Sequence, residues 1–539
     1  MTGVVEVVAT GAAADAVARV VPGLVEERLA SRLSHQDSTL WGREAESEAA
    51  ERLAWVQLHE SSRPLVDEIA LLRRGLVDEA VDHVVLCGMG GSSLAPEVIC
   101  ATAGVDLTVL DSSDPDQVRA SLGDRIERTV VVVSSKSGST VETDSQRRAY
   151  VAAFEDAGID PARRLVVVTD PGSPLDKEAR DAGFRVFNAD PRVGGRYSAL
   201  TAFGLVPCGL AGADIGALLD DAASVAPALA VDDADNPGLR LGAAMAGTDP
   251  LRDKLVLVDE GSGLAGFADW AEQLVAESTG KQDSGLLPVV VADSSAPEAT
   301  LPPHDATVVR VGGASAVEPV ETTDGSEVTV AGPLGAQMLL WEVATATAGR
   351  VLGINPFDQP DVESAKVAAR EMLSGSPEHT DPDLVDGAIE IRALGGDWLT
   401  GASSLGSAVD ALIEQLDQDR GYVAVMAYLD RLEHAGLADV RRRLAVRTKR
   451  PVTFGWGPRF LHSTGQFHKG GPPDGVYVQV TAEPRRDLPV PGRDYSFGAL
   501  IAAQAAGDAQ VLADHGRPVL RLHLTDVDEG VPALAKALS

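Results

Sequence analysis

Short apolar runs rich in β-branched residues alternate along this chain with segments of helical periodicity. Each run is bounded by Gly, Ser, Asp or Pro, as expected for strands that are buried on both faces. Such runs occupy residues 83–88, 129–135, 164–170 and 184–190, and again 254–259, 287–293, 306–312 and 326–332. This alternation predicts α/β domains built on doubly wound parallel sheets.

The chain length sets the number of domains. With 539 residues the chain is too long for a single core, so two or three domains are expected. The second set of strands predicts a domain that duplicates the structure of the first, although no residue-level repeat is visible. We expect four regions: a helical N-terminal region (1–60), a first α/β domain (61–225), a second (238–372) and a C-terminal α/β region (383–539).

The charge balance excludes several classes of partner. A net charge of −34 argues against non-specific nucleic-acid binding and disfavours docking to anionic membranes. The three cysteines form neither a CxxC motif nor a zinc-type cluster with histidine. The sequence shows no secretory signal and no stretch of about twenty apolar residues. We therefore expect a cytoplasmic protein with no nucleic-acid partner, no membrane span and no bound metal.

Two loops that follow candidate strands are rich in glycine and hydroxyl groups. The first, CGMGGSSLAPEV (87–98), lacks the Gly-x-Gly-x-x-Gly spacing of dinucleotide sites. The second, SSKSGSTVET (134–143), surrounds Lys136 with serine and threonine. Taken alone, the first loop is equally well explained as a tight turn. Because both loops fall at carboxyl ends of strands and open helices, together they favour a phosphate site.

Three further stretches carry charged or amide side chains that suit catalysis. In DPRVGGRYSAL (190–200), adjacent glycines precede Arg196, although a lone arginine is most often a surface residue. In WAEQLVAESTGK (270–281), Gln273, Glu277 and Lys281 share one helix face, a spacing that usually indicates an exposed ion pair. The third stretch is NPFDQPDVESAK (355–366), in which two prolines stiffen the segment before a helix.

These five stretches, in this order, resemble the signatures of the glucose-6-phosphate isomerase family. The resemblance covers about residues 80–366 and implies two tandem sugar-isomerase domains of the flavodoxin-like, doubly wound type. Two positions depart from the family pattern, since Ser137 replaces a threonine and Asp361 replaces a glycine. The matching segments are Gly90–Ser92, Ser135–Thr143, Gly194–Ser198, Glu277–Lys281 with Gln273, and Phe357–Lys366.

The resemblance implies an enzyme that isomerises glucose 6-phosphate to fructose 6-phosphate, the aldose–ketose step of glycolysis and gluconeogenesis. Glu277 would move the proton between C2 and C1 through a cis-enediol, Arg196 would stabilise the enediolate, and Lys366 would assist ring opening. No cofactor or metal is implied, because the neighbouring carbonyl acidifies the proton. A homodimer is expected, as is usual in the family. The implied substrate contacts are Gly91, Ser92, Ser135, Lys136, Ser137, Thr140, Gly195, Gln273 and Gln359.

One expected residue of the family is missing. The family usually places a ring-opening histidine, often from a partner subunit, between the glutamate motif and the final lysine signature. That interval holds only His304, and the matching helix carries Gln337. The stretch GPRFLHSTGQFHKGGP (457–472) offers His462 and His468 as substitutes, although a buried, hydrogen-bonded histidine is the ordinary interpretation. This region resembles the carboxyl-terminal part of the isomerase half of transaldolase–isomerase fusion proteins.

Two alternatives remain open from the sequence. A dual isomerase that also accepts mannose 6-phosphate would carry the same motifs, and assays with both substrates would separate the two. A non-catalytic sugar-phosphate sensor would keep the two hydroxyl loops. Such a sensor would not need Glu277 and Arg196 together, so their co-occurrence favours the enzyme.

Overall fold

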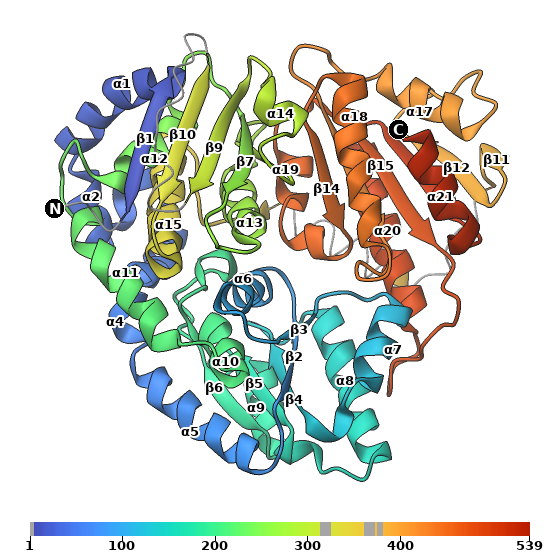
Figure 1. Cartoon of the computed structure of the whole chain (residues 1–539), viewed down its shortest axis with the longest axis horizontal. Coiled ribbons are helices and arrows are strands. Elements are labelled where there is room, and N and C mark those ends of the chain that lie inside the picture. The colour runs from blue at the N-terminus through green and yellow to red at the C-terminus, as the bar shows by residue number, and fades with distance from the viewer. Residues whose placement is uncertain (1–4, 313–324, 361–371, 374–380, 539) are drawn as a thin grey trace.

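The computed structural model describes residues 5–312, 325–360, 372–373 and 381–538 of the chain. It contains three α/β domains, each built around one mainly parallel sheet (Figure 1). In that view the first domain lies below the other two, and the second and third stand side by side.

The first sheet contains the four strands that the sequence predicts, together with the three-residue β3. Its order is β3-β2-β4-β5-β6, and every pair of neighbours is parallel. Val130 and Val132 pack into one hydrophobic cluster and Val131 and Val133 into another, so both faces of β4 are buried. The strands are β2 (His83–Gly88), β3 (Thr108–Leu110), β4 (Thr129–Ser134), β5 (Leu165–Thr169) and β6 (Arg185–Asn188).

The winding of this sheet positions the two hydroxyl loops. The chain leaves β2 toward one edge and β4 toward the other, so the loops after these neighbouring strands lie at the switch point of the sheet, where α/β domains bind ligands. The associated helices are α5 (Pro64–Asp78), α6 (Leu94–Ala103), α7 (Pro115–Gly123), α8 (Val141–Asp156), α9 (Pro174–Asp181) and α10 (Ala202–Ala211), with the 3₁₀ turns η3 (Gly90–Ser92) and η6 (Gly195–Tyr197).

The second sheet has the order β1-β10-β9-β7-β8 and includes a strand from the N-terminus. β1 pairs antiparallel with β10, whereas residues 1–60 had been expected to be helical. The run EVVATG is too short for periodicity to separate strand from helix, and its pairing with an open sheet edge decides its conformation. The strands are β1 (Glu6–Gly11), β7 (Lys254–Glu260), β8 (Leu287–Val290), β9 (Ala306–Gly312) and β10 (Ser326–Ala331).

Helices cover both faces of the second sheet. The longest, α15, packs against α11, α12 and α13, and α1 packs against α12. These helices are α1 (Ala12–Glu26), α2 (Leu29–Ser34), α3 (Glu46–Arg52), α4 (Leu58–Ser61), α11 (Ile215–Leu229), α12 (Pro237–Ala246), α13 (Phe267–Thr279), α14 (Pro297–Thr300) and α15 (Leu334–Leu352).

The third sheet repeats the topology of the second. Its order is β11-β12-β16-β15-β13-β14, in which β13 to β16 are parallel and β12 is antiparallel to β16. The strands β12 to β16 thus correspond one by one to β1 and β7 to β10. Its strands are β11 (Leu384–Asp386), β12 (Ile389–Leu394), β13 (Tyr422–Tyr428), β14 (Val452–Trp456), β15 (Gly475–Ala482) and β16 (Val519–Leu524); its helices are α17 (Leu405–Ile413), α18 (Val440–Thr448), α19 (Gly465–Gly470), α20 (Phe497–Asp514) and α21 (Val527–Ala537), with the 3₁₀ turn η8 (Arg459–His462).

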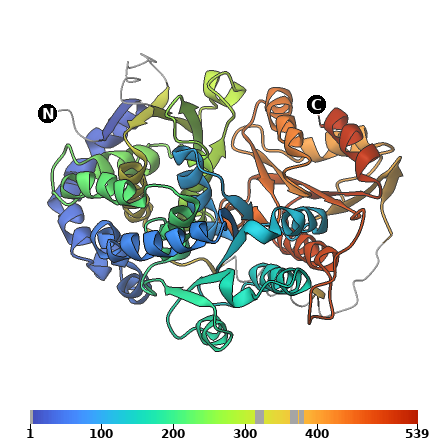
Figure 2. The same cartoon turned by 60° about the horizontal axis from the view of Figure 1, so that its bottom comes forward.

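The third domain packs into both of the others. One hydrophobic cluster joins Val256 and Val289 of the second sheet to Tyr422 and Phe467 of the third domain. Phe497, at the start of α20, belongs to the core of the first domain. The three domains therefore share cores, and α13 and α19 meet near their junction (Figures 1 and 2).

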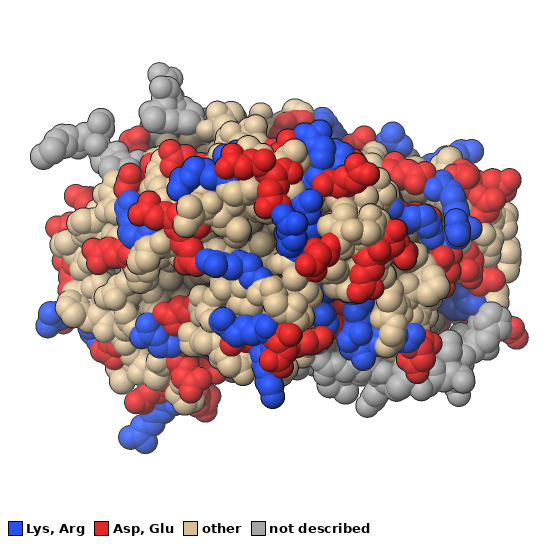
Figure 3. Space-filling model, turned by 90° about the horizontal axis from the view of Figure 1, so that it is seen from below, with Lys and Arg blue, Asp and Glu red and all other residues tan. Residues whose placement is uncertain are grey.

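The surface carries charges of both signs. Seen from below, Lys and Arg side chains are intermixed with Asp and Glu across the visible face (Figure 3). None of the helices in the described part of the chain combines the length and the apolar character needed to cross a bilayer.

Candidate active site

The loop after β2 contacts the other segments that the sequence singled out. A Cβ atom at Gly91 would lie 1.9 Å from the carbonyl oxygen of Gly195. Gly90 has a φ of 55°, and a Cβ there would lie 2.8 Å from Nε2 of Gln273 and 2.9 Å from Cβ of His462. Only glycine fits such close backbone approaches. The loop thus touches η6, α13 and the third domain at one place.

The loop after β4 presents its hydroxyl groups at the start of α8. Ser135 is buried, and its Oγ accepts the Gly138 N–H (3.1 Å) and donates to Oγ1 of Thr140 (3.2 Å). Ser137 is exposed. Lys136 is tethered, since its ammonium donates to Oδ2 of Asp170 (2.7 Å). These groups stand at the N-terminus of a 16-residue helix, a position that favours anions.

Arg196 is buried rather than on the surface. Its guanidinium donates to Oγ of Ser278 (2.8 Å), to the Pro356 carbonyl (2.7 Å) and to the side chain of Gln359. These acceptors come from the second domain, whereas Arg196 belongs to the first. The guanidinium is therefore held in place before any ligand binds.

Glu277 lies next to this guanidinium. Its Oε1 is 3.6 Å from Nη1 of Arg196, and its Oε2 accepts a hydrogen bond from Nε2 of Gln273 (3.1 Å). The carboxylate is nearly buried, with 9% of its side chain exposed. An exposed ion pair with Lys281, which the helical spacing alone would favour, does not form. The structure thus places a buried carboxylate beside a guanidinium that is fixed by other hydrogen bonds.

Lys281 instead holds the segment that carries Gln359. Its ammonium donates to the carbonyl oxygens of Asn355 (2.8 Å) and Asp358 (2.7 Å) and to Oδ1 of Asp358 (2.6 Å). Burial, together with the nearby Arg196, lowers the pKa of Lys281 to about 8. Gln359 thereby stays against Arg196. Lys366, the other site residue expected in this stretch, lies outside the described residues.

His462 reaches the same place from the third domain. Its Nε2 is 3.2 Å from Oε1 of Glu142, and its carbonyl oxygen accepts the second Gln273 N–H (2.7 Å). Oε1 of Glu142 also accepts a hydrogen bond from Gln504 of α20 (2.6 Å). Glu142 and Gln504 were not among the expected site residues. Glu142 could have been found, because it lies in the matched loop motif, whereas Gln504 has no local sequence signal.

His468 has a different environment. Its Nδ1 is 2.9 Å from the hydroxyl of Tyr422, and its ring stacks on that of Tyr422. Burial and the neighbouring Lys469 and Arg517 hold the pKa of His468 well below its usual value. These contacts lie in the core between the second and third sheets. They agree with the interpretation of His468 as a buried, hydrogen-bonded histidine. His304 is also remote from the site residues, since it pairs with Asp419 at the surface.

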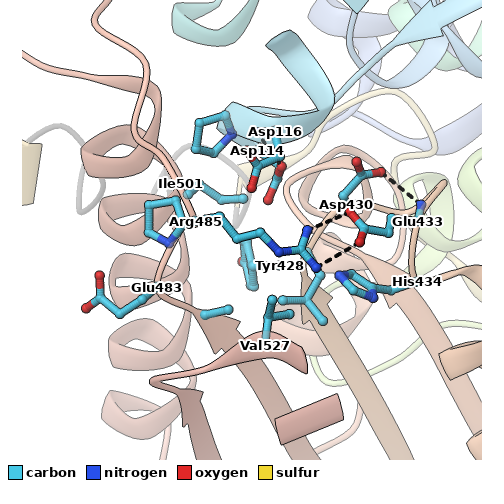
Figure 4. Close-up of a pocket in the computed structure, with 14 residues that line it drawn as sticks. Asp114, Asp116, Tyr428, Asp430, Glu433, His434, Glu483, Arg485, Ile501 and Val527 are labelled. Carbon is cyan, nitrogen blue, oxygen red and sulfur yellow. Dashed lines mark hydrogen bonds and ion pairs between the residues drawn. The ribbon is translucent and has the colours of Figure 1, made fainter. Parts of the chain in front are cut away.

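A pocket lies at the carboxyl ends of β13 and β15, facing the start of α7 (Figure 4). Five of its 14 lining residues are acidic, among them Asp114 and Asp430, and burial raises the pKa of Asp114 to about 6. Arg485 donates to Glu433 within it. None of the site residues expected from the sequence lines this pocket, so it is separate from the Glu277 site.

Parts of the chain match known proteins. Residues 56–228 match the model of the phosphoglucose isomerase family. The chain is 30% identical over 351 residues to a protein of Rippkaea orientalis named glucose-6-phosphate isomerase, over 55% of this chain and 66% of that relative. The chain is therefore similar, over part of its length, to proteins named glucose-6-phosphate isomerase. It spans just under two thirds of the length of that relative.

Solved structures show the same fold. A hypothetical protein of Thermus thermophilus superposes with a TM-score of 0.57 and 26% identity, over 69% of this chain and 100% of the other. A glucose-6-phosphate isomerase of Chlamydia trachomatis gives a TM-score of 0.52 at 20% identity, over 67% of this chain and 86% of the other. The α/β fold with parallel sheets, as expected from the sequence, is thus shared with both of these structures.

Proposed function

We propose that this protein is a glucose-6-phosphate isomerase that interconverts glucose 6-phosphate and fructose 6-phosphate. The observation that carries the proposal is the contact between Glu277 and Arg196, 3.6 Å apart, beside two hydroxyl loops at a sheet switch point. The names of the relatives agree with this reaction. A binding module for sugar phosphates would not need a buried base and a fixed guanidinium together.

The proton transfer is assigned to Glu277. In the open-chain sugar the carbonyl acidifies the neighbouring C–H bond, so a positioned carboxylate is a sufficient base. Glu277 takes the proton from C2, which leaves a cis-enediolate with its charge on O1. The hydroxyl proton then passes from O2 to O1, and Glu277 returns its proton to C1 as the C2 carbonyl forms. Arg196 stays charged throughout and stabilises the developing oxyanion. Its hydrogen bonds to Ser278 and Pro356 orient it for that role in advance.

The phosphate is assigned to the loop after β4. The hydroxyls of Ser135, Ser137 and Thr140 stand at the start of α8, where backbone N–H groups and the helix dipole favour an anion. Lys136 adds a positive charge, although its ammonium is paired with Asp170. The sugar hydroxyls would contact Gly91, Ser92, Gly195, Gln273 and Gln359.

Ring opening is assigned to His462. Glu142 faces its Nε2 (3.2 Å) and thereby orients the imidazole, which leaves Nδ1 to exchange a proton with the sugar. We prefer His462 to His468, because the ring of His468 is stacked on Tyr422 in a buried core. Lys366 is proposed for the same step. A homodimer and a cytoplasmic location stay predictions.

The test compares the wild type with Glu277→Gln, which keeps the shape of the side chain and removes its basicity. We expect the variant to lose interconversion and solvent exchange at C1 of fructose 6-phosphate by about 10²- to 10⁴-fold. It should still exchange the α and β anomers of glucose 6-phosphate, which needs ring opening only. Full isomerase activity in the variant would contradict the assignment. A parallel assay with mannose 6-phosphate separates a dual isomerase from the proposed enzyme.

A further inference from the structure

The turn that carries His462 is fastened to the first domain by an arginine. Arg459 begins η8, the turn that ends at His462. Its Nη1 donates to Oδ2 of Asp111 (2.7 Å), and its Nη2 donates to Glu97. Asp111 directly follows β3, and Glu97 lies on α6. The contact therefore joins the third domain to the first, three residues from the proposed ring-opening histidine.

A second arginine of the third domain contacts the same two carboxylates. Nη2 of Arg431, from the segment after β13, donates to Oε1 of Glu97 (3.0 Å), and its Nε is 3.3 Å from Oδ1 of Asp111. Two guanidiniums of the third domain thus face two carboxylates of the first, and each partner touches both opposite charges. Burial acts to raise the pKa of Glu97, but the two arginines together outweigh it and hold that pKa at about 2. We call these four residues the clamp: Glu97, Asp111, Arg431 and Arg459.

The clamp is poorly explained as a source of stability. Its charges are partly or wholly removed from water, since none of the Asp111 side chain, 15% of the Arg459 side chain and 31% of the Glu97 side chain is exposed. Burying charges in this way costs about as much as the pairing returns. The third domain is also attached by apolar cores that it shares with both other domains. The clamp instead fixes the position of η8 relative to the first domain.

The clamp joins two segments that contribute residues to the proposed site. Glu97 is on the helix that follows Gly90–Ser92 directly, and Arg459 is in the same turn as His462. Gln273 bridges the carbonyl of His462 and the carboxylate of Glu277 (2.7 and 3.1 Å). A shift of the turn would therefore move His462 relative to both the sugar-binding loop and the base.

We propose that Arg459, with Arg431, is a positioning residue for ring opening, which holds His462 over the bound cyclic sugar phosphate. The inference rests on the proposed function, because it needs His462 to act on a closed ring. Arg459 itself touches no reacting atom. Its role is separable from proton transfer, which Glu277 performs on the open chain.

The experiment measures the two steps separately. Anomer exchange of glucose 6-phosphate, followed by NMR, reports ring opening. Solvent exchange at C1 of 5-deoxyfructose 6-phosphate reports proton transfer alone, because this ketose lacks the hydroxyl that closes its ring. Arg459→Lys keeps the charge but cannot bridge Glu97 and Asp111 as a planar fork does. Arg493→Met is the matched control, since Arg493 also links the third domain to the first, through Asp144 (2.6 Å), at an exposed position.

We expect Arg459→Lys to slow anomer exchange by about 10- to 100-fold, as a displacement of about 1 Å can do, with C1 exchange of the open-chain analogue unchanged. Arg431→Lys should act in the same direction, and Arg493→Met should leave both rates unchanged. Unchanged anomer exchange, or an equal fall in both rates with a lower melting temperature, overturns the proposal. If the wild type catalyses neither exchange, the proposed function itself fails, so the two failures are distinguishable.

Discussion

Nη1 of Arg196 lies 3.6 Å from Oε1 of Glu277, so a guanidinium of the first domain faces a carboxylate of the second. Both groups are almost wholly buried, and each is held by further hydrogen bonds from the second domain. A buried ion pair held in this way resists rearrangement, because breaking it leaves an unpaired charge away from water. The pair is therefore held in a fixed arrangement at the boundary of the two domains.

Substitution of Arg196 should lower the rate of isomerisation far more than it weakens substrate binding. We expect Arg196→Lys to lower kcat by about 10²- to 10³-fold, because lysine keeps the charge but cannot contact Ser278 and Gln359 together while facing the enediolate. Steady-state isomerase kinetics test this. Arg192→Lys is the control, since Arg192 is exposed and pairs with Asp190 (2.8 Å). A variant at Arg196 that keeps more than half of its kcat would show that the guanidinium is dispensable.

The sequence predicts the strands well, but it does not predict the burial of the candidate site residues. Runs such as 129–135 are apolar on both faces, so their burial in a parallel sheet follows from composition. The burial of Glu277 does not follow from its helix, where its spacing from Lys281 suggests an exposed pair. Its environment comes from η6, the loop after β2 and the third domain, all distant in the sequence. From the sequence, these residues can be assigned to one site only because the family motifs occur in the family's order.

The close approach of Gly91 to Gly195 gives a sharp test of packing. A Cβ at Gly91 would lie 1.9 Å from the Gly195 carbonyl oxygen, whereas a Cβ at Gly195 meets no atom within 4 Å. We expect Gly91→Ala to lower the free energy of unfolding by about 1–3 kcal/mol. Gly195→Ala should change it by less than about 0.5 kcal/mol. Urea unfolding of both variants measures the difference, and equal effects would mean that the two loops do not touch.

Glu272 gives the protein a pH-dependent stability. Burial and the nearby Asp269 raise the pKa of Glu272 from 4.5 to about 8. The folded state then holds this proton more tightly than the unfolded state. The group's contribution is fully present below about pH 4.5 and is lost as the pH rises through about 8. Glutamine imitates the protonated form and can still accept the hydrogen bond from Ser463 (2.8 Å).

We therefore expect Glu272→Gln to be more stable than the wild type by a margin that widens as the pH rises. Urea unfolding near pH 6 and near pH 8.5 tests this, and the wild type should lose stability relative to the variant between the two. The exposed Glu155→Gln controls for the change in net charge. Parallel stability curves for wild type and Glu272→Gln would show that Glu272 is ionised in the folded protein at neutral pH.

The last prediction concerns which chain supplies the histidine. In the family this residue often comes from a partner subunit, but here Gln273 donates to both Glu277 (3.1 Å) and the carbonyl of His462 (2.7 Å) of the same chain. The base and the histidine should then act only when they are intact in one molecule. Mixing the Glu277→Gln and His462→Ala proteins tests this, after co-expression so that any subunits can exchange.

We expect the mixture to show no more activity than the average of the two variants. If two chains shared each site, mixed dimers would contain one intact site, and activity would recover to about a quarter of the wild type. Light scattering at the assay concentration shows whether mixed dimers can form at all. Recovery would place His462 in a partner's site, whereas its absence in a dimeric protein means that the third domain of each chain takes the place of the partner subunit.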